Sequence, residues 1–261
     1  MNARPIVNML WIGDSLGRIE CLSMASWLEA GHKVRLHAYG PVSNVPSGVE
    51  MVDAARTASP KTIGMLRHRK TGSFALASDY FRYRLQQNGA GLWSDLDVVC
   101  LKPVPIDGDV VFGLEDSKVI NGAVLYLKQG LQLTESLAGL FVDNLIPDWT
   151  RRSRARKLKV KRFFGMRIRP ADLPWGTYGP MAISELARKY GYFDAAKTQD
   201  VFYPLHYNDA HRIYDPSFSL DEIVGERTLT VHLWNEKLRD LKKTQPASGS
   251  PLNKLLVRFG L

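Results

Sequence analysis

The chain has 261 residues, of which 45% are hydrophobic and 23% charged, an ordinary composition for a globular protein. No apolar run reaches the ~18–20 residues of a membrane-spanning helix. Residues 1–15 lack the long apolar core of a signal peptide, and two cysteines are too few for a disulfide framework. We therefore expect a cytoplasmic protein. The formal net charge is +9, yet ten of the 35 basic residues lie in 151–169, which leaves 25 against 26 acidic residues elsewhere.

The predicted elements alternate between strand and helix from the start. Residues 5–12 and 32–40 predict strands, with a helix over 15–30 between them. Gly31 predicts the end of that helix, and a short strand is expected over 49–54. This β-α-β order is typical of an α/β sheet.

Two carboxylates interrupt an otherwise apolar segment in the middle of the chain. A helix is expected over 73–87, and residues 91–100 predict one strand that carries Asp95 and Asp97. Side chains two positions apart project from the same face of a strand, so we expect the two charges to repel each other and removal of one to relieve strain. A divalent cation would compensate them, since hard cations prefer carboxylate oxygens. An exposed edge strand is the alternative.

The second half of the chain also contains both predicted strands and predicted helices. The remaining predicted elements are strands over 109–115, 120–128 and 227–235, and helices over 133–145, 179–191 and 250–260. No repeat or low-complexity linker divides the chain. We therefore expect a single domain over 1–261, with a basic insertion at about 150–170.

Four further residues have both a functional and a structural interpretation. Asp79 and Arg82 are neighbours at i and i+3 on the predicted helix, where they form either part of a site or a surface ion pair. His232 is either a metal ligand or a hydrogen-bonded core histidine. Trp11 ends the first strand, where ligands of open α/β sheets bind, or it belongs to the core. Neither a dinucleotide-binding glycine fingerprint nor a P-loop is present.

Residues 75–104 resemble the sugar-binding D-x-D region of glycosyltransferases of the initiating-mannosyltransferase and α-1,4-glycosyltransferase type. The shared pattern is an Ala-Ser-Asp-x-x-Arg helix, a glycine turn, D-x-D and then Lys-Pro, which here comprises Ala77, Ser78, Asp79, Arg82, Gly89, Gly91, Asp95, Asp97, Lys102 and Pro103. Residues 231–235 are similar to the family's His-x-Trp segment. The opening strand departs from the pattern with Asn8 in place of its usual histidine, and the Thr-Gly-Pro segment has Tyr178 inserted.

The resemblance implies a GT-A-type nucleotide-sugar-binding fold, a mixed sheet flanked by helices, and metal-dependent retaining transfer. The metal would be Mn²⁺ or Mg²⁺, held by Asp97 and His232, while Asp95 would contact the metal or the ribose. The donor would be a UDP-sugar, with a GDP-sugar as the alternative. The acceptor would be a glycan or glycolipid in surface polysaccharide or lipopolysaccharide synthesis.

The same resemblance assigns the remaining site residues. Asp79 and Arg82 would hold the donor sugar and ribose, and Trp11 would stack on the base. Asn121 is a candidate near the donor sugar. No residue is singled out as a covalent nucleophile.

Two other functions stay open, and so does the role of the basic segment. A metal-dependent phosphohydrolase would use the same D-x-D, and a nucleic-acid-binding module would use residues 151–169. We favour contact of 151–169 with an anionic membrane on its cytoplasmic face, or with a glycolipid, over nucleic acid. A solvated loop without a partner is the alternative.

Overall fold

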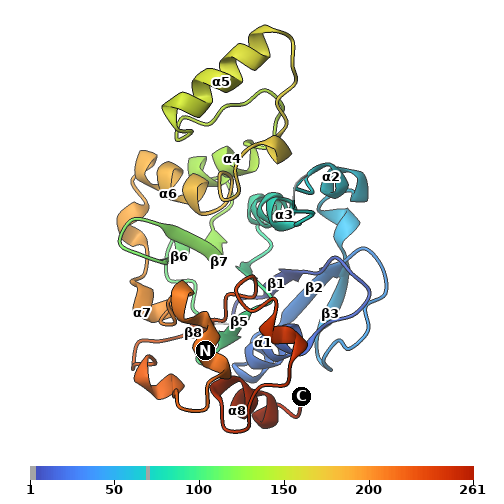
Figure 1. The fold of residues 1–261 in the computed structure, drawn as a ribbon, viewed down its shortest axis with the longest axis vertical. Coiled ribbons are helices and arrows are strands. Elements are labelled where there is room, and N and C mark those ends of the chain that lie inside the picture. The colour runs from blue at the N-terminus through green and yellow to red at the C-terminus, as the bar shows by residue number, and fades with distance from the viewer. Residues whose placement is uncertain (1–3, 69–70) are drawn as a thin grey trace.

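A computed structural model describes residues 4–68 and 71–261. Its centre is a six-stranded sheet in the order β3-β2-β1-β4-β7-β6 (Figure 1). The three pairings among β3, β2, β1 and β4 are parallel, and those of β7 with β4 and β6 are antiparallel. The strands are β1 (Val7–Leu10), β2 (Val34–Ala38), β3 (Glu50–Asp53), β4 (Leu92–Ser94), β6 (Val110–Leu114) and β7 (Ile120–Leu127). The predicted α/β fold with a mixed sheet flanked by helices is confirmed.

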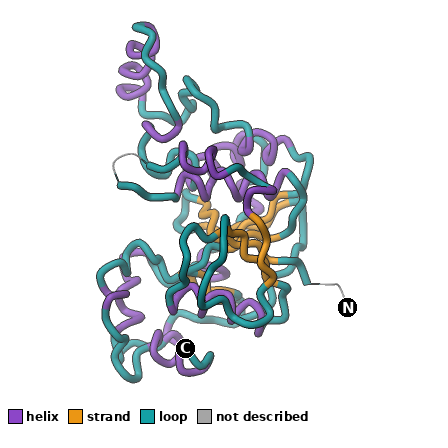
Figure 2. The backbone as a smooth tube through the Cα atoms, turned by 90° about the vertical axis from the view of Figure 1, so that its right-hand side faces the viewer, coloured by secondary structure: helices purple, strands orange, loops and turns teal. Residues whose placement is uncertain are grey.

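Helices cover both faces of this sheet, with the strands gathered between them (Figure 2). Since neighbouring strand residues face opposite sides, Leu92 of β4 packs into one hydrophobic core and Trp93 into the other. The first core includes residues of α1 and α8, and the second includes residues of α3, α4 and α6. The bounds are α1 (Arg18–Glu29), α3 (Ala75–Gln87), α4 (Gln132–Ala138), α6 (Pro180–Lys189) and α8 (Pro251–Arg258).

The predicted single strand over 91–100 is wrong, and the difference defines the site. The chain leaves the central sheet after Ser94, turns, and begins β5 (Val98–Cys100), which pairs antiparallel with β8 (Thr230–His232) in a separate two-stranded sheet. The turn is fixed by two backbone hydrogen bonds, in which Asp95 donates to the carbonyl of Ala123 at 2.8 Å and accepts from Val98 at 3.3 Å. Asp95 and Asp97 therefore lie in a turn between two sheets.

Three other helical segments differ from the sequence prediction. The helix expected over 133–145 ends at Ala138, because Gly139 is a poor helix residue. The short helices α2 (Pro60–Met65) and α7 (Gln199–Phe202) were not expected. The first of these does have a recognisable start, since Ser59 caps it and proline opens it.

The basic segment forms a helix, α5 (Arg152–Phe163), which extends from the end of the molecule opposite α8 in both views (Figures 1 and 2). Among the described residues, no helix has both the length and the hydropathy needed to cross a membrane.

Candidate metal centre

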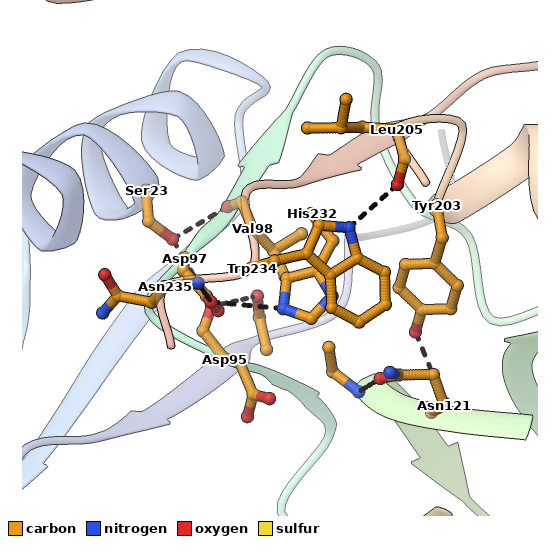
Figure 3. A network of polar contacts seen from close by, with 12 residues as sticks. Ser23, Asp95, Asp97, Val98, Asn121, Tyr203, Leu205, His232, Trp234 and Asn235 are labelled. Atoms are coloured by element: carbon orange, nitrogen blue, oxygen red, sulfur yellow. Dashed lines mark hydrogen bonds and ion pairs between the residues drawn. The ribbon is translucent and has the colours of Figure 1, made fainter. Parts of the chain in front are cut away.

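Asp97 is buried and held from two sides. Its Oδ2 accepts a hydrogen bond from the backbone N–H of Asn235 at 2.7 Å and lies 3.2 Å from Nε2 of His232 (Figure 3). Burial disfavours the carboxylate, but attraction to His232 and these hydrogen bonds outweigh it, so the pKa of Asp97 is lowered. Asp97 is therefore ionised at neutral pH.

His232 reaches Asp97 through the small second sheet. In the antiparallel register of β5 and β8 it lies opposite Val98, the residue after Asp97. The indole of Trp234 packs against the imidazole, with ring centroids 4.0 Å apart, and Trp234 itself has a positive φ of 58°. Burial lowers the pKa of His232, but the charge of Asp97 and its hydrogen bond together outweigh burial, so the net shift is upward. In the absence of a metal, Nε2 of His232 and Oδ2 of Asp97 therefore hold each other as a buried pair.

Asp95 is bound by a different set of partners. Its Oδ1 accepts a hydrogen bond from the indole N–H of Trp93 at 2.8 Å and lies 3.0 Å from Nη2 of Arg82. Each of the two carboxylates therefore has its own partner within the protein, the guanidinium of Arg82 for Asp95 and the imidazole of His232 for Asp97. The expectation that Asp95 and Asp97 strain the fold until a cation binds is thus wrong, because Arg82 and His232 already compensate them.

The three side chains nevertheless form a potential ligand set. Asp95, Asp97 and His232 each offer one ligand atom, and these atoms all lie within 4.8 Å of one another. Adjacent ligands of an octahedral ion with bonds of ~2.0–2.1 Å are ~2.9 Å apart, close to the 3.2 Å between Asp97 and His232. Two carboxylates and an imidazole suit Mn²⁺ and Mg²⁺. A metal would take the position of the proton that His232 now shares with Asp97, since coordination requires the neutral imidazole.

Asp79 and Arg82 belong to the same polar group rather than to the surface. Arg82 is buried, and its Nη1 donates to the carbonyl of Gly122 at 2.5 Å while Nη2 faces both Asp95 and, at 3.6 Å, Asp79. Burial raises the pKa of Asp79 to about 7 despite the nearby guanidinium. The alternative of an exposed ion pair is therefore excluded. Gly179, which precedes α6, is packed so tightly here that a Cβ would lie 2.9 Å from Oδ2 of Asp79.

Asn121 is linked to Asp95 through the backbone of Ala123. Its Oδ1 accepts a hydrogen bond from the backbone N–H of Ala123 at 2.7 Å, and the carbonyl of Ala123 in turn anchors the N–H of Asp95. Figure 3 shows the Asn121 side chain beside Tyr203, whose hydroxyl accepts from Val124 N–H at 3.0 Å. Asn121 thus holds the segment of β7 against which the Asp95 turn is built.

Trp11 lies outside this group of contacts. It follows β1, donates its backbone N–H to His37 at 2.9 Å, and packs its ring against Gly13, where a Cβ would be 3.1 Å from the indole nitrogen. The first contact is with β2 and the second is within the loop that follows β1, and neither is with Asp95 or Asp97. Stacking of Trp11 on a nucleotide base stays a prediction.

Two acidic residues near the centre had no recognisable pattern in the sequence. Glu115 is half-buried after β6, accepts a hydrogen bond from Asn121 at 2.7 Å, and has a raised pKa because of burial. Glu20 of α1 is buried and accepts from the side chains of Asn235 and Lys242 at 3.0 and 2.8 Å. Glu20 therefore supports the loop that binds Asp97, while Glu115 adds negative charge on the side of Asn121.

The chain matches no protein-family model and no curated protein at a significant level.

Proposed function

We propose that the protein is a metal-dependent, retaining glycosyltransferase of GT-A type. It would move a sugar from a nucleotide-sugar, with UDP-sugars preferred over GDP-sugars, to a glycan or glycolipid acceptor. The observation that carries the proposal is the convergence of Asp95, Asp97 and His232 within 4.8 Å next to the buried Asp79–Arg82 pair. The D-x-D resemblance assigns these five residues to one donor site, and the contacts of Arg82 with Asp79 and Asp95 and of His232 with Asp97 support the proposal.

The chain's residues would then have distinct tasks. Asp97 and His232 would hold Mn²⁺ or Mg²⁺, which when bound neutralises the diphosphate leaving group and so lowers the barrier by several kcal/mol. Asp95 is fixed by Trp93 and Arg82, so it would keep one orientation toward the metal or the ribose. Because its guanidinium is buried and pre-positioned, Arg82 would contribute an oriented positive charge at no reorganisation cost.

A metal-dependent phosphohydrolase is the second candidate, and one feature of the structure favours it. That activity needs a further carboxylate to activate water, and none lies near Asp95 in the sequence. The fold supplies Glu115, whose carboxyl group accepts a hydrogen bond from Asn121 and interacts electrostatically with His232. The two candidates differ in substrate, because a phosphohydrolase would cleave simple phosphate esters and a transferase would not.

A ligand panel tests the proposal. Melting temperatures are measured with UDP, GDP and their sugars, each with and without Mn²⁺. A ligand at 100 times its Kd stabilises the fold by ~2.7 kcal/mol, and we expect that gain for UDP or a UDP-sugar only when Mn²⁺ is present. Stabilisation by GDP but not by UDP would show that the donor base is guanine. No response to any nucleotide would contradict a transferase. Phosphate release from p-nitrophenyl phosphate would favour the hydrolase.

A further inference from the structure

The helix α5 is an exposed basic ridge attached firmly to the body. Residues 151–169 contain ten Lys and Arg and no acid, and Leu158 is the one buried residue of α5 itself. Leu158 and, beyond the helix, Ile168 pack into the second hydrophobic core. These two contacts fix the position of the helix, so its charges are presented on a defined surface rather than on a freely moving loop.

A few of the basic side chains hold the segment in place. Arg162 donates to the carbonyl of Asn144 at 3.2 Å, Arg154 donates to that of Asp172 at 3.4 Å, and Arg167 forms an ion pair with Asp143. The others on α5 are exposed, namely Arg152, Arg156, Lys157, Lys159 and Lys161. Because the rest of the chain is nearly neutral, this ridge has a local positive field that an anionic surface would neutralise.

Apolar side chains follow directly after the charges. Phe163 is 86% exposed, Phe164 71% and Met166 48%, and the two phenylalanine rings contact each other with centroids 5.5 Å apart. Exposed aromatic groups of this size mark interaction surfaces. Basic residues beside exposed aromatic residues are the composition that binds the interface of an anionic membrane.

We propose that residues 151–169 dock the protein on an anionic membrane surface. The basic side chains of α5 would lie over the headgroups, and Phe163, Phe164 and Met166 would insert at the boundary with the acyl chains. A membrane is favoured over nucleic acid because the aromatic residues form a separate tip after the charged run instead of alternating with it, as base-stacking side chains do. This proposal does not depend on the proposed function, because it uses no residue of the metal centre.

Sedimentation with vesicles tests the docking. The wild-type protein is spun with vesicles of phosphatidylcholine alone and with vesicles containing a quarter phosphatidylglycerol, at low and high salt. We expect binding only to the anionic vesicles and weaker binding at high salt, because the attraction is screened. Absence of binding to anionic vesicles, or equal binding to both kinds, would overturn the proposal.

Two variants with the same change in net charge distinguish an effect of the α5 surface from an effect of the overall charge of the protein. Lys157→Glu/Lys159→Glu and Lys254→Glu/Arg258→Glu change the net charge equally, but the second pair lies on α8 at the opposite end of the molecule (Figure 1). The first should weaken vesicle binding by about tenfold or more, and the second by less than about twofold. Equal losses would contradict a local docking surface.

The apolar tip and the competing partner are tested in the same assay. Phe163→Ser/Phe164→Ser should leave binding at low salt but lose most of it at high salt, where the apolar contribution dominates. If single-stranded RNA or duplex DNA displaces the vesicles and binds more tightly through Lys157 and Lys159, the partner is a nucleic acid and the membrane proposal is wrong.

Discussion

Replacing Asp97 by asparagine separates the two roles of this side chain, as the partner of His232 and as the proposed metal ligand. Asparagine keeps an oxygen that accepts the N–H of Asn235, so that 2.7 Å hydrogen bond survives. The charge that pairs with Nε2 of His232 at 3.2 Å is lost. The largest upward contribution to the pKa of His232, which comes from Asp97, is lost with that charge, so the proton on His232 is held less tightly.

The size of the effect follows from these contacts. Loss of one partner of a buried pair that stays charged costs ~3–5 kcal/mol, but His232 can release its proton, so the loss of one charge-assisted hydrogen bond, ~1–3 kcal/mol, is the better measure. For a chain of this length each kcal/mol lowers the melting temperature by ~2–4 °C. The metal-free variant should therefore melt a few degrees lower, while a direct ligand role predicts that its response to Mn²⁺ with nucleotide disappears.

The assay is a pair of measurements on each protein, melting temperature with and without Mn²⁺–nucleotide, and donor hydrolysis with Mn²⁺. Asn235→Ala is the matched control, because it removes the side-chain bond to Glu20 but keeps the backbone N–H to Asp97. The control should melt at a lower temperature but still be stabilised by Mn²⁺–nucleotide. Asp97→Asn should melt at a lower temperature, show no stabilisation by Mn²⁺–nucleotide, and hydrolyse the donor at least about a hundredfold more slowly. An Asp97→Asn protein with wild-type hydrolysis and a full metal response would exclude Asp97 as a metal ligand.

Three further changes test the polar group around Arg82. Burial raises the pKa of Asp79 to about 7 from 3.8, so the folded protein holds this proton longer than the unfolded chain and loses stability as pH rises from about 4 to 7, by at most ~1.4 kcal/mol per pH unit. Asp79→Asn should reduce this dependence of the melting temperature on pH, and an unchanged dependence would exclude Asp79 as its source. Arg82→Lys should cost ~1–3 kcal/mol in urea unfolding, because one ammonium cannot serve Asp95 and the Gly122 carbonyl together, and an unchanged free energy of unfolding would contradict this. Gly179→Ala should lower the melting temperature by a crowding cost of ~1–3 kcal/mol, since its Cβ would lie 2.9 Å from Asp79, and a neutral result would mean that Asp79 can move away freely.

The sequence was informative where local pattern decides structure. The β-α-β opening and the helix with Asp79 and Arg82 follow from periodicity and end residues, and the structure places both as expected. The D-x-D resemblance paired Asp97 with His232 across more than a hundred residues. No local pattern could do so, because the pairing depends on the antiparallel register of β5 with β8.

The break after Ser94 was missed for a physical reason. Apolar residues continue on both sides of Asp95 and Asp97, so periodicity alone predicts one strand. The turn is imposed by a tertiary contact, the 2.8 Å hydrogen bond from Asp95 N–H to Ala123, and by the transfer of β5 to a second sheet.

The helical state of α5 and the role of Glu115 were missed for related reasons. Like charges crowd along α5, which argues against a helix in isolation, and packing of Leu158 against the body helps to hold it. Glu115 lies next to Asp116 and outside the D-x-D segment in the sequence, and its hydrogen bond with Asn121 is a tertiary contact that no local pattern indicates.

Direct binding of a divalent ion by Asp97 and His232 can be tested by pulsed electron paramagnetic resonance of Mn²⁺, which does not rely on turnover. With Mn²⁺ and UDP added to the wild-type protein, coordination by His232 predicts a hyperfine coupling to an imidazole nitrogen. The coupling should be absent in His232→Gln, which keeps a polar side chain of similar size, and should persist in Asn235→Ala. A wild-type spectrum without nitrogen coupling, or a coupling that survives in His232→Gln, would contradict the metal centre.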